Sequence, residues 1–123
     1  MGFFSKIFGQ GETSKLEWNI IQSEEDVDQI MEESQNQPCV IFKHSTRCSI
    51  SSMALNRFEK GWNPEQGIKI FYLDLIRYRP LSDLIAERFH IQHESPQVIV
   101  VRDGHAVYHA SHNAIDPKII SKQ

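Results

Sequence analysis

Three short apolar runs, separated by helical patterns, limit what this 123-residue chain can fold into. The runs are residues 39–43 (Cys-Val-Ile-Phe-Lys), 68–73 (Ile-Lys-Ile-Phe-Tyr-Leu) and 98–101 (Val-Ile-Val-Val). A nearly continuous apolar run is typical of a strand that is covered on both faces. The residues between the runs place apolar side chains at helical spacing. The alternation predicts an α/β protein with a mixed central β-sheet flanked by helices.

The expected order of elements is β-α-β-α-β-α-β-β-α. Strand–helix–strand crossovers predict parallel neighbours, and the Asp103-Gly104 turn predicts an antiparallel hairpin at the end. The helix after Cys48 should bury a face made by Ile50, Ala54, Phe58 and Trp62 and should stop near Gly61. The other expected strands are residues 18–21 and 106–109, and the other expected helices begin after Ser23, near Pro80 and after Asp116.

Composition and length favour one small domain. We expect residues 1–15 to be an N-terminal extension, docked or disordered, and residues 16–123 to form the domain. A net charge of −3 gives no sign of a nucleic-acid partner. No apolar stretch approaches the roughly 18 residues that span a bilayer, so we expect no stable membrane association. The first nine residues are too short and glycine-broken for a secretory signal, and we expect a cytoplasmic protein.

Cys48 is the candidate nucleophile, because it stands where a strand passes into a helix. Ligands of such sheets bind beyond the carboxyl ends of the parallel strands. The helix N-terminus and the neighbouring Arg47 should both favour the thiolate. Ser51 stands where a dithiol enzyme would carry its second cysteine; its hydroxyl can hydrogen-bond the thiolate but cannot form a disulfide. Cys39, about 15 Å away along the strand, should be an inert core residue.

A second candidate segment precedes the strand at residues 98–101. Pro96 marks either a tight, sometimes cis, junction or simply the start of a strand, and the residues alone leave both readings open. If this segment faces Cys48, the Ser95 backbone could pair with an extended substrate. We expect no metal site: His105 and His109 would lie roughly 13 Å apart on a strand, with His112 nearby. A phosphatase loop is excluded, because it needs arginine where Ala54 stands.

Three motifs in the chain resemble the YtxJ family of monothiol bacilliredoxins, in the thioredoxin superfamily. They are Phe42–Ser51 (FKHSTRCSIS), His93–Gln97 (HESPQ) and His109–His112 (HASH), and the similarity runs from about Trp18 to Ile120. The resemblance implies a thioredoxin-like fold and removal of bacillithiol from mixed disulfides on cytosolic proteins. It places the nucleophile on Cys48, the serine that replaces a second cysteine on Ser51, and a cis-proline on Pro96. The family commonly has proline where this chain has Ser49, which keeps an N–H donor.

The resemblance also implies a reaction cycle without a bound cofactor. Cys48 would take bacillithiol from the protein, and a second bacillithiol would release it as a disulfide for a flavin- and NADPH-dependent reductase. Arg47, and more weakly Lys43, would contact the malate carboxylates of bacillithiol, and Thr46, Ser49, Ser95 and Pro96 complete the expected substrate contacts. Two alternatives stay open: an iron–sulfur cluster held between two protomers, as in some monothiol glutaredoxins, and a non-catalytic adaptor of the same fold.

Overall fold

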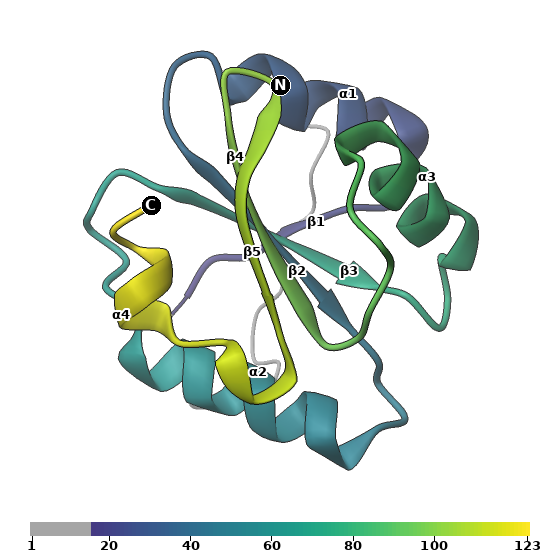
Figure 1. Cartoon of the computed structure of the whole chain (residues 1–123), viewed down its shortest axis with the longest axis vertical. Helices are drawn as coiled ribbons and strands as arrows, with labels where there is room; N and C mark the ends of the chain where they lie inside the picture. Colours follow the sequence, from purple (N-terminus) through teal and green to yellow (C-terminus); the bar gives the residue numbers. More distant parts are fainter. Residues whose placement is uncertain (1–15) are drawn as a thin grey trace.

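A computed structural model describes residues 16–123, and the expected extension at residues 1–15 lies outside the described residues. The order of elements is the expected one, with a short 3-10 turn added after the last strand (Figure 1). The strands are β1 (Asn19–Ile20), β2 (Cys39–His44), β3 (Lys69–Asp74), β4 (Gln97–Arg102) and β5 (His105–Ser111). The helices are α1 (Glu24–Glu33), α2 (Ser49–Gly61), α3 (Arg79–Phe89), the 3-10 turn η1 (His112–Ala114) and α4 (Pro117–Ile120).

The strands form one mixed sheet in the order β1-β3-β2-β4-β5. Strands β1, β3 and β2 are parallel, whereas β4 is antiparallel to β2 and β5 is antiparallel to β4. The expected hairpin is confirmed. The expectation that the crossover through α3 makes a parallel neighbour is wrong for β4.

The connection after α3 explains the reversal of β4. Helix α3 ends at His90, whose left-handed backbone (φ 58°, ψ 44°) turns the chain back. Residues 91–96 then return to the carboxyl end of the parallel strands, where β3 ended. The register shows this: Asp74 at the end of β3 pairs with His44, and Gln97 at the start of β4 pairs with the adjacent Lys43. The crossover thus travels out along α3 and back again, and β4 runs opposite to β3.

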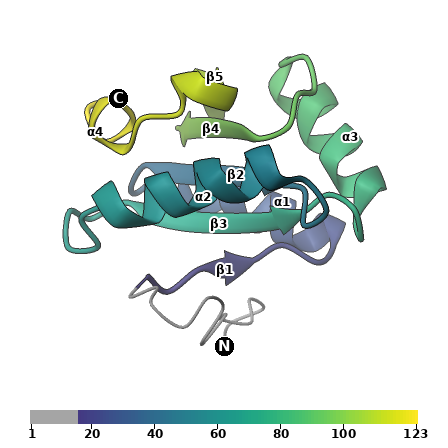
Figure 2. The same cartoon turned by 90° about the horizontal axis from the view of Figure 1, so that it is seen from below.

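Helices cover both faces of the sheet. Helices α1 and α3 pack on one face and α2 and α4 on the other (Figure 1). Figure 2 looks onto the sheet, with α2 in front of the strands and α1 behind them. Each layer has its own apolar core, one around Phe42 and Phe58, the other around Ile41 and Phe71. Within residues 16–123, no helix is long and apolar enough to cross a membrane.

Helix α2 differs from its expected pattern in its first turn. Ala54, Phe58 and Trp62 are buried as expected, but Ile50 is 57% exposed and Ser51 is fully buried. The register of the helix therefore turns a serine, rather than an isoleucine, toward the sheet. The reason is a polar partner on β2, described below.

Local sequence signals account for several element ends. Ser23 caps α1 in a reciprocal capping box with Asp26. Asp103 and Gly104 both have positive φ (51° and 77°), as the two-residue turn of a twisted hairpin requires. The turn also rests on the end of α1, because its two N–H groups donate to the carbonyl and the hydroxyl oxygen of Ser34, each at 2.8 Å.

Candidate active site

Cys48 is the N-cap residue of α2, at the carboxyl end of β2. Its backbone is extended (φ −117°, ψ 121°), and its carbonyl accepts the first helical bond, from Ser52 N–H at 3.0 Å. The thiol is half-buried and free. The first N–H groups of a helix lack partners inside it, so those of α2 are donors close to Cys48. The expected placement of Cys48 is confirmed.

The residues that flank Cys48 are open to solvent. Thr46, Arg47 and Ser49 are all exposed. Among the described residues, Arg47 forms no ion pair. Its guanidinium is therefore free to meet an anionic group that approaches the thiol.

Ser51 is held by a neighbouring strand residue that sequence reasoning missed. Its buried hydroxyl oxygen lies 2.7 Å from His44 Nδ1 and accepts the N–H of Ser45 at 3.0 Å. Burial lowers the pKa of His44 from its usual 6.5, with Asp74 opposing, which favours the neutral ring. The tautomer of that ring decides whether Nδ1 accepts the hydroxyl proton or donates to the hydroxyl oxygen. Within residues 16–123, the structure shows no hydrogen bond to Cys48 Sγ, from the Ser51 hydroxyl or from another residue.

The contact between His44 and Ser51 closes the turn that carries Cys48. His44 ends β2, Ser51 lies in the first turn of α2, and residues 45–48 run between them. The only sequence signal was a histidine directly after an apolar strand, seven residues before a serine.

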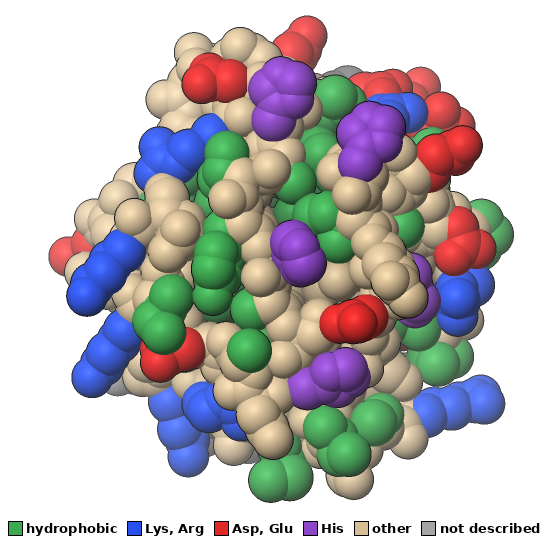
Figure 3. Space-filling view, in the orientation of Figure 1, with side chains coloured by type: hydrophobic (Ala, Val, Ile, Leu, Met, Phe, Trp, Pro, Cys, Tyr) green, Lys and Arg blue, Asp and Glu red, His purple; other side chains and the backbone are tan. Residues whose placement is uncertain are grey.

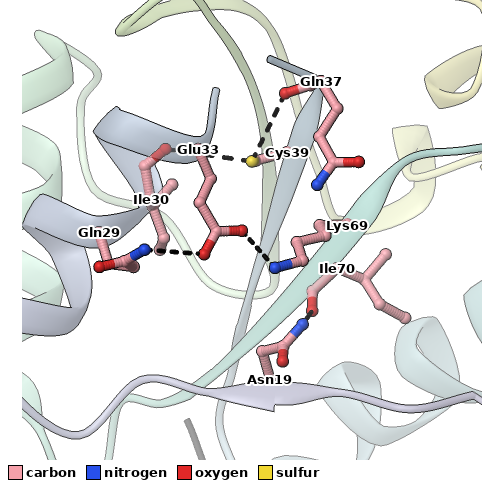
Figure 4. A network of polar contacts seen from close by, with 8 residues as sticks. All are labelled: Asn19, Gln29, Ile30, Glu33, Gln37, Cys39, Lys69 and Ile70. Carbon is pink, nitrogen blue, oxygen red and sulfur yellow. Dashed lines mark hydrogen bonds and ion pairs between the residues drawn. The ribbon is translucent and has the colours of Figure 1, made fainter. Parts of the chain in front are cut away.

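Cys39 lies at the other end of β2 and cannot assist Cys48. Its Sγ is fully buried, 3.7 Å from the carbonyl oxygen of Gln37 and 4.0 Å from that of Ile30 (Figure 4). Burial and the carboxylate of Glu33 raise the pKa of the Cys39 thiol to about 12, against the weaker effect of Lys69. This thiol stays protonated near neutral pH and is inert, as expected.

The Ser95–Pro96 segment directly precedes β4 and lies at the same end of the sheet as the Cys48 turn, because Gln97 pairs with Lys43 near the carboxyl end of β2. The peptide bond between these residues is cis, which decides between the two readings of Pro96. Pro96 O accepts the N–H of His112 at 3.1 Å. Within residues 16–123, no hydrogen bond satisfies the Ser95 backbone or its buried hydroxyl oxygen. The Ser95 N–H and C=O are therefore unpaired within the described residues.

Lys43 does not take the position expected for a substrate contact. Its side chain is fully buried, and Nζ lies 3.3 Å from the carbonyl oxygen of Ser82 on α3 and 3.4 Å from His93 Nδ1. The expectation that Lys43 contacts bacillithiol is wrong, because strand alternation turns it into the layer beneath α3. Sequence reasoning missed Ser82, and it included His93 only as the first residue of the HESPQ motif, without a role.

The histidines do not form a common site. Several histidine side chains lie apart from one another on the face shown in Figure 3, whereas His44 is buried. The part of the chain that the structure describes contains no group of three or more potential metal ligands.

Comparison with known proteins agrees with this geometry. The family described as monothiol bacilliredoxin BrxC matches residues 19–120. A solved structure described as a proposed oxidoreductase with a thioredoxin fold shares 30% identity, with a TM-score of 0.73, over 85% of this chain and 92% of that one.

More distant structures show the fold alone. Thioredoxin from Trypanosoma brucei brucei has 16% identity and a TM-score of 0.64, over 94% of this chain and 93% of its own. Thioredoxin from Malassezia sympodialis has 17% identity and a TM-score of 0.66, over 89% and 90%. Family and fold together support a thiol redox function. The thioredoxin fold and the match over residues 19–120 establish that the chain belongs to the BrxC family of monothiol bacilliredoxins.

Proposed function

We propose that the protein removes bacillithiol from mixed disulfides on other proteins, with Cys48 as its single nucleophile. The observation that carries this proposal is the isolation of Cys48. Ser51 fills the position of a resolving cysteine and is bonded to His44, and Cys39 is buried at the far end of the same strand. A thiol outside the protein must therefore complete the cycle.

The reaction consists of two successive thiol–disulfide exchanges. The Cys48 thiolate attacks the bacillithiol sulfur, an S–S bond forms between them, and the substrate protein leaves as its thiolate. The thiolate of a second bacillithiol then attacks the adduct, so that Cys48 leaves as a thiolate and oxidised bacillithiol is formed. A flavin- and NADPH-dependent reductase would supply the two electrons that regenerate bacillithiol. The protein itself needs no bound cofactor.

Arg47 and the Ser95 backbone are the proposed recognition groups. Bacillithiol carries malate carboxylates, and Arg47 is an exposed guanidinium next to the nucleophile. Ser95 offers an N–H and a C=O to the extended chain of the substrate protein. Thr46 and Ser49 line the approach to Cys48, and both are exposed.

Intact-mass and peptide mass spectrometry test the first step. After reaction with a bacillithiolated protein, we expect one bacillithiol adduct, located on Cys48. Cys48→Ala should abolish release of the substrate thiol, and Cys39→Ala, the matched control, should retain it. An adduct on Cys39, or full activity in Cys48→Ala, would contradict the proposal.

Specificity for bacillithiol needs a separate comparison. One model protein is blocked in turn with bacillithiol, cysteine and coenzyme A, and release is followed for each. We expect the bacillithiol adduct to be removed fastest, and Arg47→Gln to reduce that preference about tenfold, the effect of one charge-assisted hydrogen bond. Equal rates for the three adducts would contradict specificity for bacillithiol and would indicate a general disulfide reductase.

A further inference from the structure

Lys43 is a fully buried charge that the exchange chemistry does not use. It stands on β2 one residue before His44, and its Nζ contacts two other parts of the chain. One contact is the carbonyl oxygen of Ser82 on α3, and the other is His93 Nδ1 in the segment 91–96. A buried ammonium is costly unless it is hydrogen-bonded, so these contacts are required of the fold.

The contact with His93 fixes the state of that ring. An ammonium group only donates, so a hydrogen bond from charged Lys43 requires Nδ1 to be an acceptor and the ring to be neutral. Ser82 Oγ lies 3.0 Å from the same nitrogen. Burial, Lys43 and Arg79 lower the pKa of His93, against Asp83 and Glu94. Lys43 and the Ser82 hydroxyl therefore contact the same nitrogen of His93, and together they hold the ring in one orientation.

A second buried side chain holds the same segment. Gln97 is the register partner of Lys43 across the β2–β4 ladder, so their side chains point to the same face of the sheet. Gln97 Nε2 donates to the carbonyl oxygen of Gln92 at 3.0 Å. Gln92 is therefore hydrogen-bonded to Gln97, and His93 to Lys43. Ser95 follows His93 by two residues.

We propose that Lys43 is a positioning residue: its ammonium, through His93, holds residues 92–95 so that the Ser95 backbone is ready to pair with the chain of the substrate protein. The inference deepens the proposed function and rests on it for the identity of the protein substrate. Lys43 itself touches neither the substrate nor Cys48 in this role. Its loss should weaken binding of a polypeptide substrate and spare the reaction of the thiol.

The test compares two substrates in the full-length protein. One is a model protein carrying a mixed disulfide, and the other is 2-hydroxyethyl disulfide, which has no peptide chain to pair with Ser95. In Lys43→Met we expect KM for the protein substrate to rise about tenfold, the scale of one lost buried hydrogen bond. The rate with the small disulfide should stay within about twofold of wild type, because that reaction needs only Cys48.

Substitutions at His93 separate positioning from general damage. His93→Gln offers a carbonyl oxygen to Lys43 and should keep most of the protein-substrate KM, whereas His93→Leu should reproduce the loss. Lys60→Met, at an exposed lysine on α2, is the matched control and should behave as wild type. An unchanged KM in Lys43→Met, or parallel losses with both substrates, would overturn the role of Lys43.

The same experiment keeps this inference apart from the proposed function. The model protein is blocked with bacillithiol in one arm and with cysteine in the other. If wild type turns over only the cysteine-blocked protein, the bacillithiol proposal fails and the Lys43 effect is still measured. Turnover of neither protein overturns both.

Discussion

At the scale of single residues, the hydroxyl oxygen of Ser51 has a structural role at the position where a dithiol enzyme carries its second cysteine. Its spacing from Cys48 could be read from the sequence, and so could the lack of a local disulfide. Its partner could not, because the contact with His44 depends on how the end of β2 meets the first turn of α2. Lys43 illustrates the same limit: a cation in the motif was interpreted as a weaker contact for the bacillithiol carboxylates, whereas its position on β2 buries its side chain beneath α3.

Ser51→Ala should lower stability by about 1–3 kcal/mol, because it leaves His44 Nδ1 and the Ser45 N–H unpaired. Ser52→Ala, in the same turn but exposed, should change the unfolding free energy by less than about 0.5 kcal/mol. Urea unfolding of the two variants measures both. Equal effects would mean that the contact with His44 adds nothing to stability.

At the scale of elements, the sequence predicted the order and type of the helices and strands because their signals are local. The capping box at Ser23 and the Asp103-Gly104 turn lie within a few residues of what they determine. The direction of β4 could not be predicted in this way. The direction of β4 depends on residues 91–96, which return along α3 to the end of the sheet where β3 ended. The sequence of this loop does not determine at which end of the sheet the next strand begins.

The contact between α2 and α4 gives a test at this scale. A Cβ atom at Gly61 would lie 2.6 Å from Cγ of Pro117, whose ring cannot swing away. Alanine normally stabilises a helix by about 1 kcal/mol over glycine, but the overlap should cost about 1–3 kcal/mol. We expect Gly61→Ala to be destabilising overall. In the Pro117→Ala background the same substitution should become neutral or stabilising, and thermal unfolding of the four proteins measures this coupling.

At the scale of the whole molecule, the mixed sheet separates two apolar layers, and the titration of Lys43 in one of them affects global stability. Burial lowers the pKa of Lys43 from 10.5 to about 8, with Asp83 opposing and Arg79 assisting. Between these two pH values the unfolded chain holds a proton that the folded protein has released. The contribution of Lys43 to the unfolding free energy therefore rises with pH in this window.

The expected gain is about 3 kcal/mol at most across the window. The raised pKa values of Cys39 and Tyr72 act in the opposite direction at higher pH, so a variant is needed as reference. Denaturant unfolding of wild type and Lys43→Met between pH 7 and 10 should show the difference shifting in favour of wild type as pH rises. A difference that is independent of pH would mean that Lys43 titrates normally.

The two hydrogen bonds between Ser34 and the Asp103-Gly104 turn have a consequence for local unfolding. Two turn amides donate to one serine at the end of α1, so opening that helix end removes an acceptor from each of them. We therefore expect the β4–β5 hairpin and the last turn of α1, about seventy residues apart in the chain, to open together in hydrogen exchange. Within residues 16–123, no hydrogen bond joins the Cys48 turn (residues 45–48) to α1, so the amides of this turn should exchange independently of that unit.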